Sequence, residues 1–198
     1  GIFGYFLYNS SEIPDIGGML WSVNSEVQKA IPLAGIRLRN FIMGSVPHRF
    51  FGSPGASLGT KVIYEKLGKV WKPLEHYVGT DRETRWPDFI SIKGGILKNQ
   101  TCGCTVRAIC DARNDRQFSD KIFQSQTPTK DRNFLERRYR KNPFRKYDLW
   151  CVYTSDNQLI VVTPKLRVKD YEILRVVDVI GCPTLAANAI SAVYFAYK

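Results

Sequence analysis

Two apolar, β-branched runs joined by a short polar turn constrain the fold of this chain more than any other feature. Leu149–Tyr153 reads Leu-Trp-Cys-Val-Tyr, and Leu159–Thr163 follows after the turn residues 154–157. Strand-forming residues on both sides of a short polar turn are typical of a β-hairpin. We therefore predict a hairpin over these two runs.

Other apolar runs predict further strands, and apolar residues at helical spacing predict helices. The predicted strands are a buried one at Ile2–Tyr8, then Phe89–Leu97, Thr105–Cys110 and Tyr171–Ile180. The predicted helices are Met19–Ala30, Lys61–Val70 and Leu185–Tyr197, while Ile36–Met43 fits either type. Residues 44–59 are dense in Gly, Pro and Ser and are expected to form a loop. This mixture predicts an α+β fold with a central mixed or antiparallel sheet and flanking short helices.

The length of 198 residues favours one domain. We expect a single α+β domain over residues 1–198, with an N-terminal strand and helical part at 1–47 and a terminal helix within 181–198. The chain begins with glycine instead of methionine, which favours a processed product or an excised part of a longer protein. No run of about 18 apolar residues occurs, so we expect no transmembrane segment.

Five cysteines, at positions 102, 104, 110, 151 and 182, are too sparse for a disulfide scaffold. We expect mostly reduced thiols and an intracellular location, which is cytoplasmic, nuclear or organellar. The spacing Cys102-x-Cys104 differs from that of a zinc knuckle, and the chain has only 2 histidines. We therefore expect no metal site and no Cys–His nucleophile.

The positive charge of the chain is concentrated in one segment. The chain has 29 lysines and arginines against 18 acidic residues, a formal net charge of +11. Between Lys130 and Lys146, eight basic residues stand against Asp131 and Glu136, which leaves +6 in this segment. Aromatic residues alternate with these charges, at positions 134, 139, 144 and 147. Such an excess of positive charge indicates an anionic partner.

Arginine pairs with phosphate through two hydrogen bonds, and aromatic rings stack on unpaired bases. We therefore expect a non-catalytic domain that binds nucleic acid, specifically single-stranded or looped RNA. In this interpretation either Tyr139 or Phe144 stacks on a base. A solvated surface whose aromatic residues point inward is the alternative, and acidic lipid or an acidic protein would use the same charges. The expected contact residues are Arg132, Arg137, Arg138, Tyr139, Arg140, Lys141, Phe144, Arg145 and Lys146.

A second candidate site for an anion lies in the glycine-rich stretch from Gly52 to Lys61. The stretch precedes a predicted helix, but Val62 follows Lys61 where a phosphate-binding P-loop has Ser or Thr. Backbone amides at the start of a helix bind anions without that motif. Gly52 and Ser53 are therefore candidates for an anion or NAD pocket, and a plain loop is the alternative.

Three segments resemble motifs of the poly(ADP-ribose) polymerase-type ADP-ribosyltransferases, over residues 48–180. Phe50–Pro54 is similar to the Phe-His-Gly-Ser motif of that family, and Cys104–Cys110 is similar to its central strand. Leu149–Val168 resembles its Glu-containing hairpin. The resemblance implies a split-sheet fold with a transferase-like core at 48–180, and NAD as the cofactor.

This chain departs from the family pattern at its catalytic positions. Phe51 stands in place of the NAD-binding histidine, and Leu149 stands in place of the catalytic glutamate. The resemblance therefore implies a degenerate member more than an active transferase.

A third possible function, beside RNA binding and a transferase-like role, is that of a structural subunit of a viral or ribonucleoprotein assembly. The basic surface of such a subunit neutralises a polyanion without reading its bases.

Overall fold

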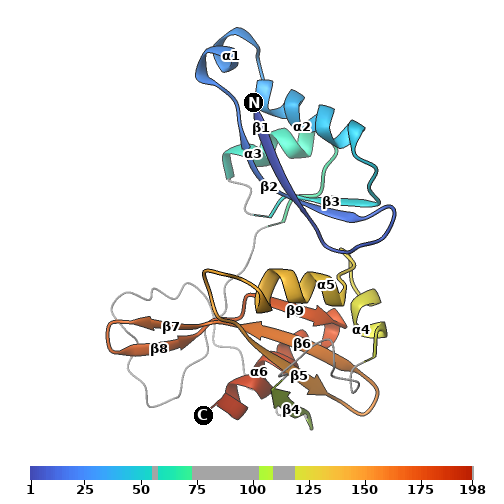
Figure 1. The fold of residues 1–198 in the computed structure, drawn as a ribbon, viewed down its shortest axis with the longest axis vertical. Coiled ribbons are helices and arrows are strands. Elements are labelled where there is room, and N and C mark those ends of the chain that lie inside the picture. Colours follow the sequence, from blue (N-terminus) through green and yellow to red (C-terminus); the bar gives the residue numbers. More distant parts are fainter. Residues whose placement is uncertain (55–57, 73–102, 109–118, 198) are drawn as a thin grey trace.

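The computed structural model describes residues 1–54, 58–72, 103–108 and 119–197 (Figure 1). Within these residues the fold is α+β, with one three-stranded sheet, one four-stranded sheet and one two-stranded hairpin. Short helices flank the sheets, as Figure 1 shows. The predicted fold class is confirmed. The predicted strand at Phe89–Leu97 lies outside the described residues.

The three-stranded sheet is built from the first 52 residues of the chain. Its strands are β1 (Ile2–Leu7), β2 (Asp15–Ser22) and β3 (Phe50–Gly52), with β1 antiparallel and β3 parallel to β2. Three helices accompany this sheet: α1 (Ser25–Ala30), α2 (Ala34–Ser45) and α3 (Leu58–Lys66). The ambiguous segment Ile36–Met43 is therefore helical.

Three predictions for this part of the chain are wrong in detail. The helix predicted at Met19–Ala30 begins only at Ser25, because the residues before it continue β2 and pair with β1. The strand predicted at Ile2–Tyr8 is present as β1, but it is an edge strand and not a buried one. Its first residue, Ile2, is 70% exposed. The predicted loop at 44–59 contains the short strand β3, which pairs with β2.

The four-stranded sheet is antiparallel and forms the centre of the second half. Its order is β4 (Thr105–Ala108), β5 (Asp148–Tyr153), β6 (Gln158–Thr163) and β9 (Asp178–Gly181). The predicted hairpin is confirmed as β5 and β6, which pair from Asp148↔Thr163 to Tyr153↔Gln158. The hairpin of β7 (Lys165–Val168) and β8 (Tyr171–Leu174) extends away from this sheet in Figure 1. The predicted strand Tyr171–Ile180 is therefore two strands, β8 and β9.

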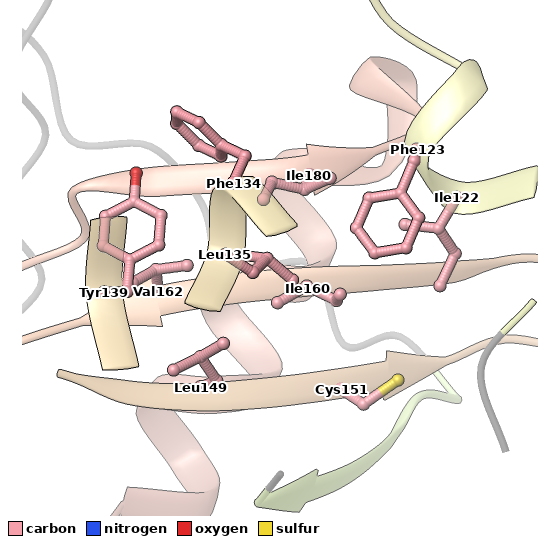
Figure 2. Packing of buried hydrophobic residues seen from close by; sticks show 10 residues of the cluster. All are labelled: Ile122, Phe123, Phe134, Leu135, Tyr139, Leu149, Cys151, Ile160, Val162 and Ile180. Atoms are coloured by element: carbon pink, nitrogen blue, oxygen red, sulfur yellow. The ribbon is translucent and has the colours of Figure 1, made fainter. Parts of the chain in front are cut away.

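Strand β6 is buried on both faces. Ile160 and Val162 face the layer of α4 (Lys121–Gln124), α5 (Arg132–Leu135) and the π-helix η1 (Glu136–Arg140), as Figure 2 shows. Leu159 and Val161 pack on the other side against α6 (Ala186–Tyr197), the predicted terminal helix. Alternate residues of a strand point to opposite faces, so this continuous apolar run fills two cores.

One buried carboxylate joins the two halves of the chain. Asp15, at the start of β2, is 0% exposed and accepts hydrogen bonds from Arg49 Nε (3.0 Å) and Nη2 (2.8 Å). It also accepts a hydrogen bond from the backbone N–H of Thr129 (2.6 Å), which lies just before α5. Asn9 Nδ2 donates to the Thr129 carbonyl (2.8 Å). The two sheets are therefore connected by hydrogen bonds that converge on Asp15 and Thr129.

The same contacts set the charge state of Asp15. Burial by itself would raise the pKa of Asp15, but the hydrogen bonds from Arg49 and Thr129 outweigh burial and lower it. A lowered pKa in the folded chain means that the carboxylate stabilises the fold above its ordinary pKa near 3.9. This stabilisation is lost as the pH falls through the lowered value.

The substitution Asp15→Asn is expected to reduce the free energy of unfolding near neutral pH by about 2–3 kcal/mol, because it removes charge-assisted hydrogen bonds. The difference between parent and variant should shrink as the pH falls below the ordinary aspartate pKa near 3.9 and toward the lowered pKa of the folded chain. Urea unfolding at neutral pH and at acid pH measures this. The control is Asp170→Asn, at an exposed turn. An equal loss at both pH values would contradict a role for the charge.

Candidate nucleic-acid interface

In α5 and η1, the helical part of the basic segment, the aromatic residues are buried while Arg137 and Arg138 are exposed. Asp131 caps α5 by accepting a hydrogen bond from the Phe134 N–H (2.6 Å), and α5 continues directly into η1. Phe134, Leu135 and Tyr139 are buried against the four-stranded sheet (Figure 2). Successive helical residues point in different directions, so Arg137, on the opposite side of η1, is exposed.

Tyr139 is a core residue of the four-stranded half of the chain. Its side chain is 7% exposed, and its hydroxyl donates to Asp178 Oδ2 at 2.7 Å. Lys130 Nζ lies 2.6 Å from the other oxygen of Asp178, and this ion pair is nearly buried. Burial, and then the negative charge of Asp178, raise the pKa of Tyr139. Because the Tyr139 ring covers the sheet, Phe144 is the better placed of the two residues that were expected to stack on a base.

Two of the predicted phosphate contacts are held by carboxylates of the same chain. Arg132 Nε lies 2.8 Å from Asp120 Oδ1. Arg140 Nε lies 3.5 Å from Glu136 Oε1, and both of these side chains are largely buried. A cation that is already paired gains less from a phosphate, because the existing pair must first be broken. These two arginines therefore contribute mainly to the packing of α5 and η1.

Five of the predicted contact residues remain exposed and make no ion pair with any residue that the structure describes. Two of them have a defined position: Arg137 Nε donates to the Asn133 carbonyl (3.3 Å), and the Arg138 guanidinium lies 5.5 Å from the centre of the Phe6 ring. Together with Phe144 they form what we call the basic surface. Its residues are Arg137, Arg138, Lys141, Phe144, Arg145 and Lys146.

Phe144 is presented to solvent by an ordered turn. Asn142 Oδ1 accepts hydrogen bonds from the backbone N–H groups of Phe144 and Arg145, both at 3.0 Å, and Asn142 Nδ2 donates to the Arg138 carbonyl at 3.2 Å. The Phe144 ring is 90% exposed. Sequence reasoning missed the role of Asn142, although an Asn followed by Pro143 is a recognised turn signal.

The second candidate site lies in the other half of the chain. Gly52 ends β3, and Ser53 follows it directly, so both lie beside the three-stranded sheet and are not part of the basic surface. Phe51 is half-buried in β3, whereas Leu149 lies in β5 of the four-stranded sheet and is 3% exposed. Nothing in the described part of the chain tests the transferase-like arrangement, which stays a prediction.

The cysteines differ in state. Cys104 is disulfide-bonded, so the expectation of reduced thiols does not hold at this position. Cys151 is a buried free thiol. Cys182 is free and half-buried, and hydrogen bonds from the side chain and backbone of Thr184 lower its pKa. Cys102 and Cys110 lie outside the described residues.

Two further searches cover the described residues only. Within them, no group of three or more His, Cys, Asp or Glu side chains is placed to hold a metal ion. None of the helices that the structure describes is both long enough and apolar enough to cross a membrane.

Comparison with known proteins gives no relative: no family model, no curated protein and no solved structure matches this chain.

The substitution Tyr139→Phe separates the structural role of Tyr139 from a binding role. We expect the free energy of unfolding to fall by about 1–2 kcal/mol, because Asp178 loses a buried hydrogen bond. The affinity for an RNA oligonucleotide should stay within about twofold of the parent value. Urea unfolding and fluorescence anisotropy measure the two quantities, with Tyr5→Phe on β1 as the control. Weaker RNA binding at unchanged stability would restore Tyr139 as a stacking residue.

Proposed function

We propose that this chain binds single-stranded RNA through the basic surface. The observation that carries this proposal is the Phe144 ring, 90% exposed on a turn that Asn142 holds in place. Lys141, Arg145 and Lys146 flank the ring and are exposed. An aromatic ring between unpaired cations is the arrangement by which proteins hold a base and its neighbouring phosphates.

The exposure of Phe144 contributes little to folding. A ring that remains in water buries almost no apolar area, so the hydrophobic effect does not explain its position. The two hydrogen bonds to Asn142 nevertheless order the turn that carries it. Because the turn is already ordered, little conformational entropy is lost when a base stacks on the ring. Such stacking is worth about 1–3 kcal/mol per base.

The geometry favours an unpaired strand over a duplex. A single ring on a projecting turn reaches the face of a base only where that base is unstacked from its neighbours. The exposed cations Lys141, Arg145 and Lys146 flank Phe144 in the chain. They are therefore available to contact the backbone phosphates on either side of a base that stacks on the ring. Binding to a lipid surface would need a continuous exposed apolar face. Phe134 and Tyr139 of this segment are buried in the core, so they are not available for such a face.

The role of Phe144 also separates this proposal from that of a subunit that only neutralises a polyanion. Such a subunit contacts phosphates alone, so its affinity depends on the cations and not on an aromatic ring. Charge variants and a Phe144 variant therefore test different parts of the proposal.

Replacing Lys141, Arg145 and Lys146 together with Glu is expected to weaken binding of a single-stranded oligouridylate by more than about 100-fold at moderate salt. The slope of log affinity against log salt should become shallower by about 2, because three phosphate contacts are lost. Fluorescence anisotropy over a salt series measures both. These three side chains make no ion pair with the described residues, so the fold should be retained.

The matched control replaces Lys66, Lys69 and Lys72 with Glu. These lysines are exposed at and beyond the end of α3, in the other half of the chain, and their reversal changes the net charge equally. The control variant should keep most of the affinity. Equal losses in the two triple variants would show that only the overall charge attracts RNA, and would refute the basic surface.

The substitution Phe144→Ala is expected to weaken binding of the oligouridylate by about 5- to 100-fold, which corresponds to the loss of one stacked base. The salt slope should not change, because no charge is removed. Phe144→Trp should retain the affinity, and binding of duplex RNA should be equal in parent and Phe144→Ala. If Phe144→Ala binds the single strand as tightly as the parent does, the surface neutralises phosphates without stacking.

A further inference from the structure

Arg39 is a buried cation for which the described residues supply no counter-charge. It lies in α2, its side chain is 6% exposed, and it forms no ion pair with the residues that the structure describes. Its guanidinium carbon lies 4.7 Å from the centre of the Phe51 ring and 5.4 Å from that of Tyr64. Two aromatic rings compensate part of the cost of burying a charge. Buried charges in proteins are nevertheless normally paired.

One edge of the Arg39 guanidinium is unused. Nη1 donates to Asn40 Oδ1 at 3.0 Å. Nε is buried and has no hydrogen-bond partner, and Nη2 makes no hydrogen bond with a described residue. Nε and Nη2 together form the fork that binds two oxygens of one oxyanion. Arg49 uses the same fork, Nε and Nη2, to hold the carboxylate of Asp15.

The surroundings of Phe51 offer a second donor. A Cβ atom placed on Gly18 would lie 2.9 Å from the tip of the Phe51 ring and 3.2 Å from Ser53 Oγ. The Ser53 hydroxyl and the tip of the Phe51 ring therefore lie around the same space beside Gly18, and the Phe51 ring also contacts Arg39. Ser53 has no hydrogen bond within the described chain. This is the residue that sequence analysis identified, with Gly52, as a candidate for anion binding.

We propose that Arg39 and Ser53 bind a phosphate group beside the ring of Phe51. Phosphate offers the fork of Arg39 two oxygens and leaves others for the Ser53 hydroxyl, which a carboxylate with only two oxygens does not. Nε has no exposed surface, so the side chains that cover it must move when phosphate binds. The site lies in the three-stranded half of the chain and does not depend on the basic surface.

The test is titration of the folded chain with inorganic phosphate, at constant ionic strength set with sodium chloride, followed by calorimetry and thermal unfolding. Phosphate should bind and raise the unfolding midpoint, whereas acetate should raise it less. Arg39→Met should weaken phosphate binding by at least about tenfold, the loss expected for charge-assisted hydrogen bonds. Ser53→Ala should weaken it by about 2- to 10-fold.

Without phosphate, Arg39→Met should unfold at the same temperature as the parent or above it, because a buried charge that two aromatic rings compensate only in part has been removed. A structural role for Arg39 alone would instead lower that temperature. If Arg39→Met does not fold, Arg39→Lys decides the question, because lysine keeps the charge but has no fork. Arg39→Lys is expected to bind phosphate at least about tenfold more weakly than the parent.

Two controls separate this site from the basic surface. Arg37→Met, at an exposed position of the same helix, should bind phosphate as the parent does. The triple Glu variant at positions 141, 145 and 146 should also retain phosphate binding. The proposal is overturned if phosphate has no effect beyond that of chloride. It is also overturned if the Arg39 variants respond as the parent does, or if only the triple variant loses the response.

Discussion

The buried carboxylate of Asp15 is the contact on which the arrangement of the two halves depends. Its oxygens are bound by Arg49 from the end of the N-terminal part and by the backbone of Thr129, which leads into α5. A buried carboxylate that lost these donors would be costly, so the pairing restrains where α5 begins. Ser10 extends the same junction, because its N–H donates to Asp131, the residue that caps α5.

The position of α5 then decides which residues of the basic segment face water. Phe134 and Leu135 cover one face of the four-stranded sheet, and Phe134 also lies 6.3 Å from the ring of Phe6 in β1. With that face buried, the charged side of η1 and the turn that follows it are left exposed. The candidate interface is thus the exposed side of η1 and of the turn after it, whereas the buried side of α5 and η1 packs against the four-stranded sheet.

Prediction from sequence succeeded where the signal was local. The hairpin of β5 and β6 and the terminal helix α6 follow from runs of strand-forming and helix-forming residues, and both are present. It failed at β2, where the apolar residues at helical spacing after Gly18 also suit a strand and β1 supplies the pairing partner. Which of the two structures forms there depends on a partner that local sequence does not reveal.

The same distinction between local sequence signals and contacts distant in the sequence applies to the candidate sites. The sequence by itself determined that positive charge and aromatic rings are concentrated between Lys130 and Lys146, because composition and spacing are local properties. Only the tertiary structure decided that Tyr139 is inside and Phe144 outside, and that Arg132 and Arg140 are paired with carboxylates. It also decided that Arg39 is buried next to Phe51 and Tyr64. The physical reason is that burial and pairing arise from contacts between residues that lie far apart in the chain.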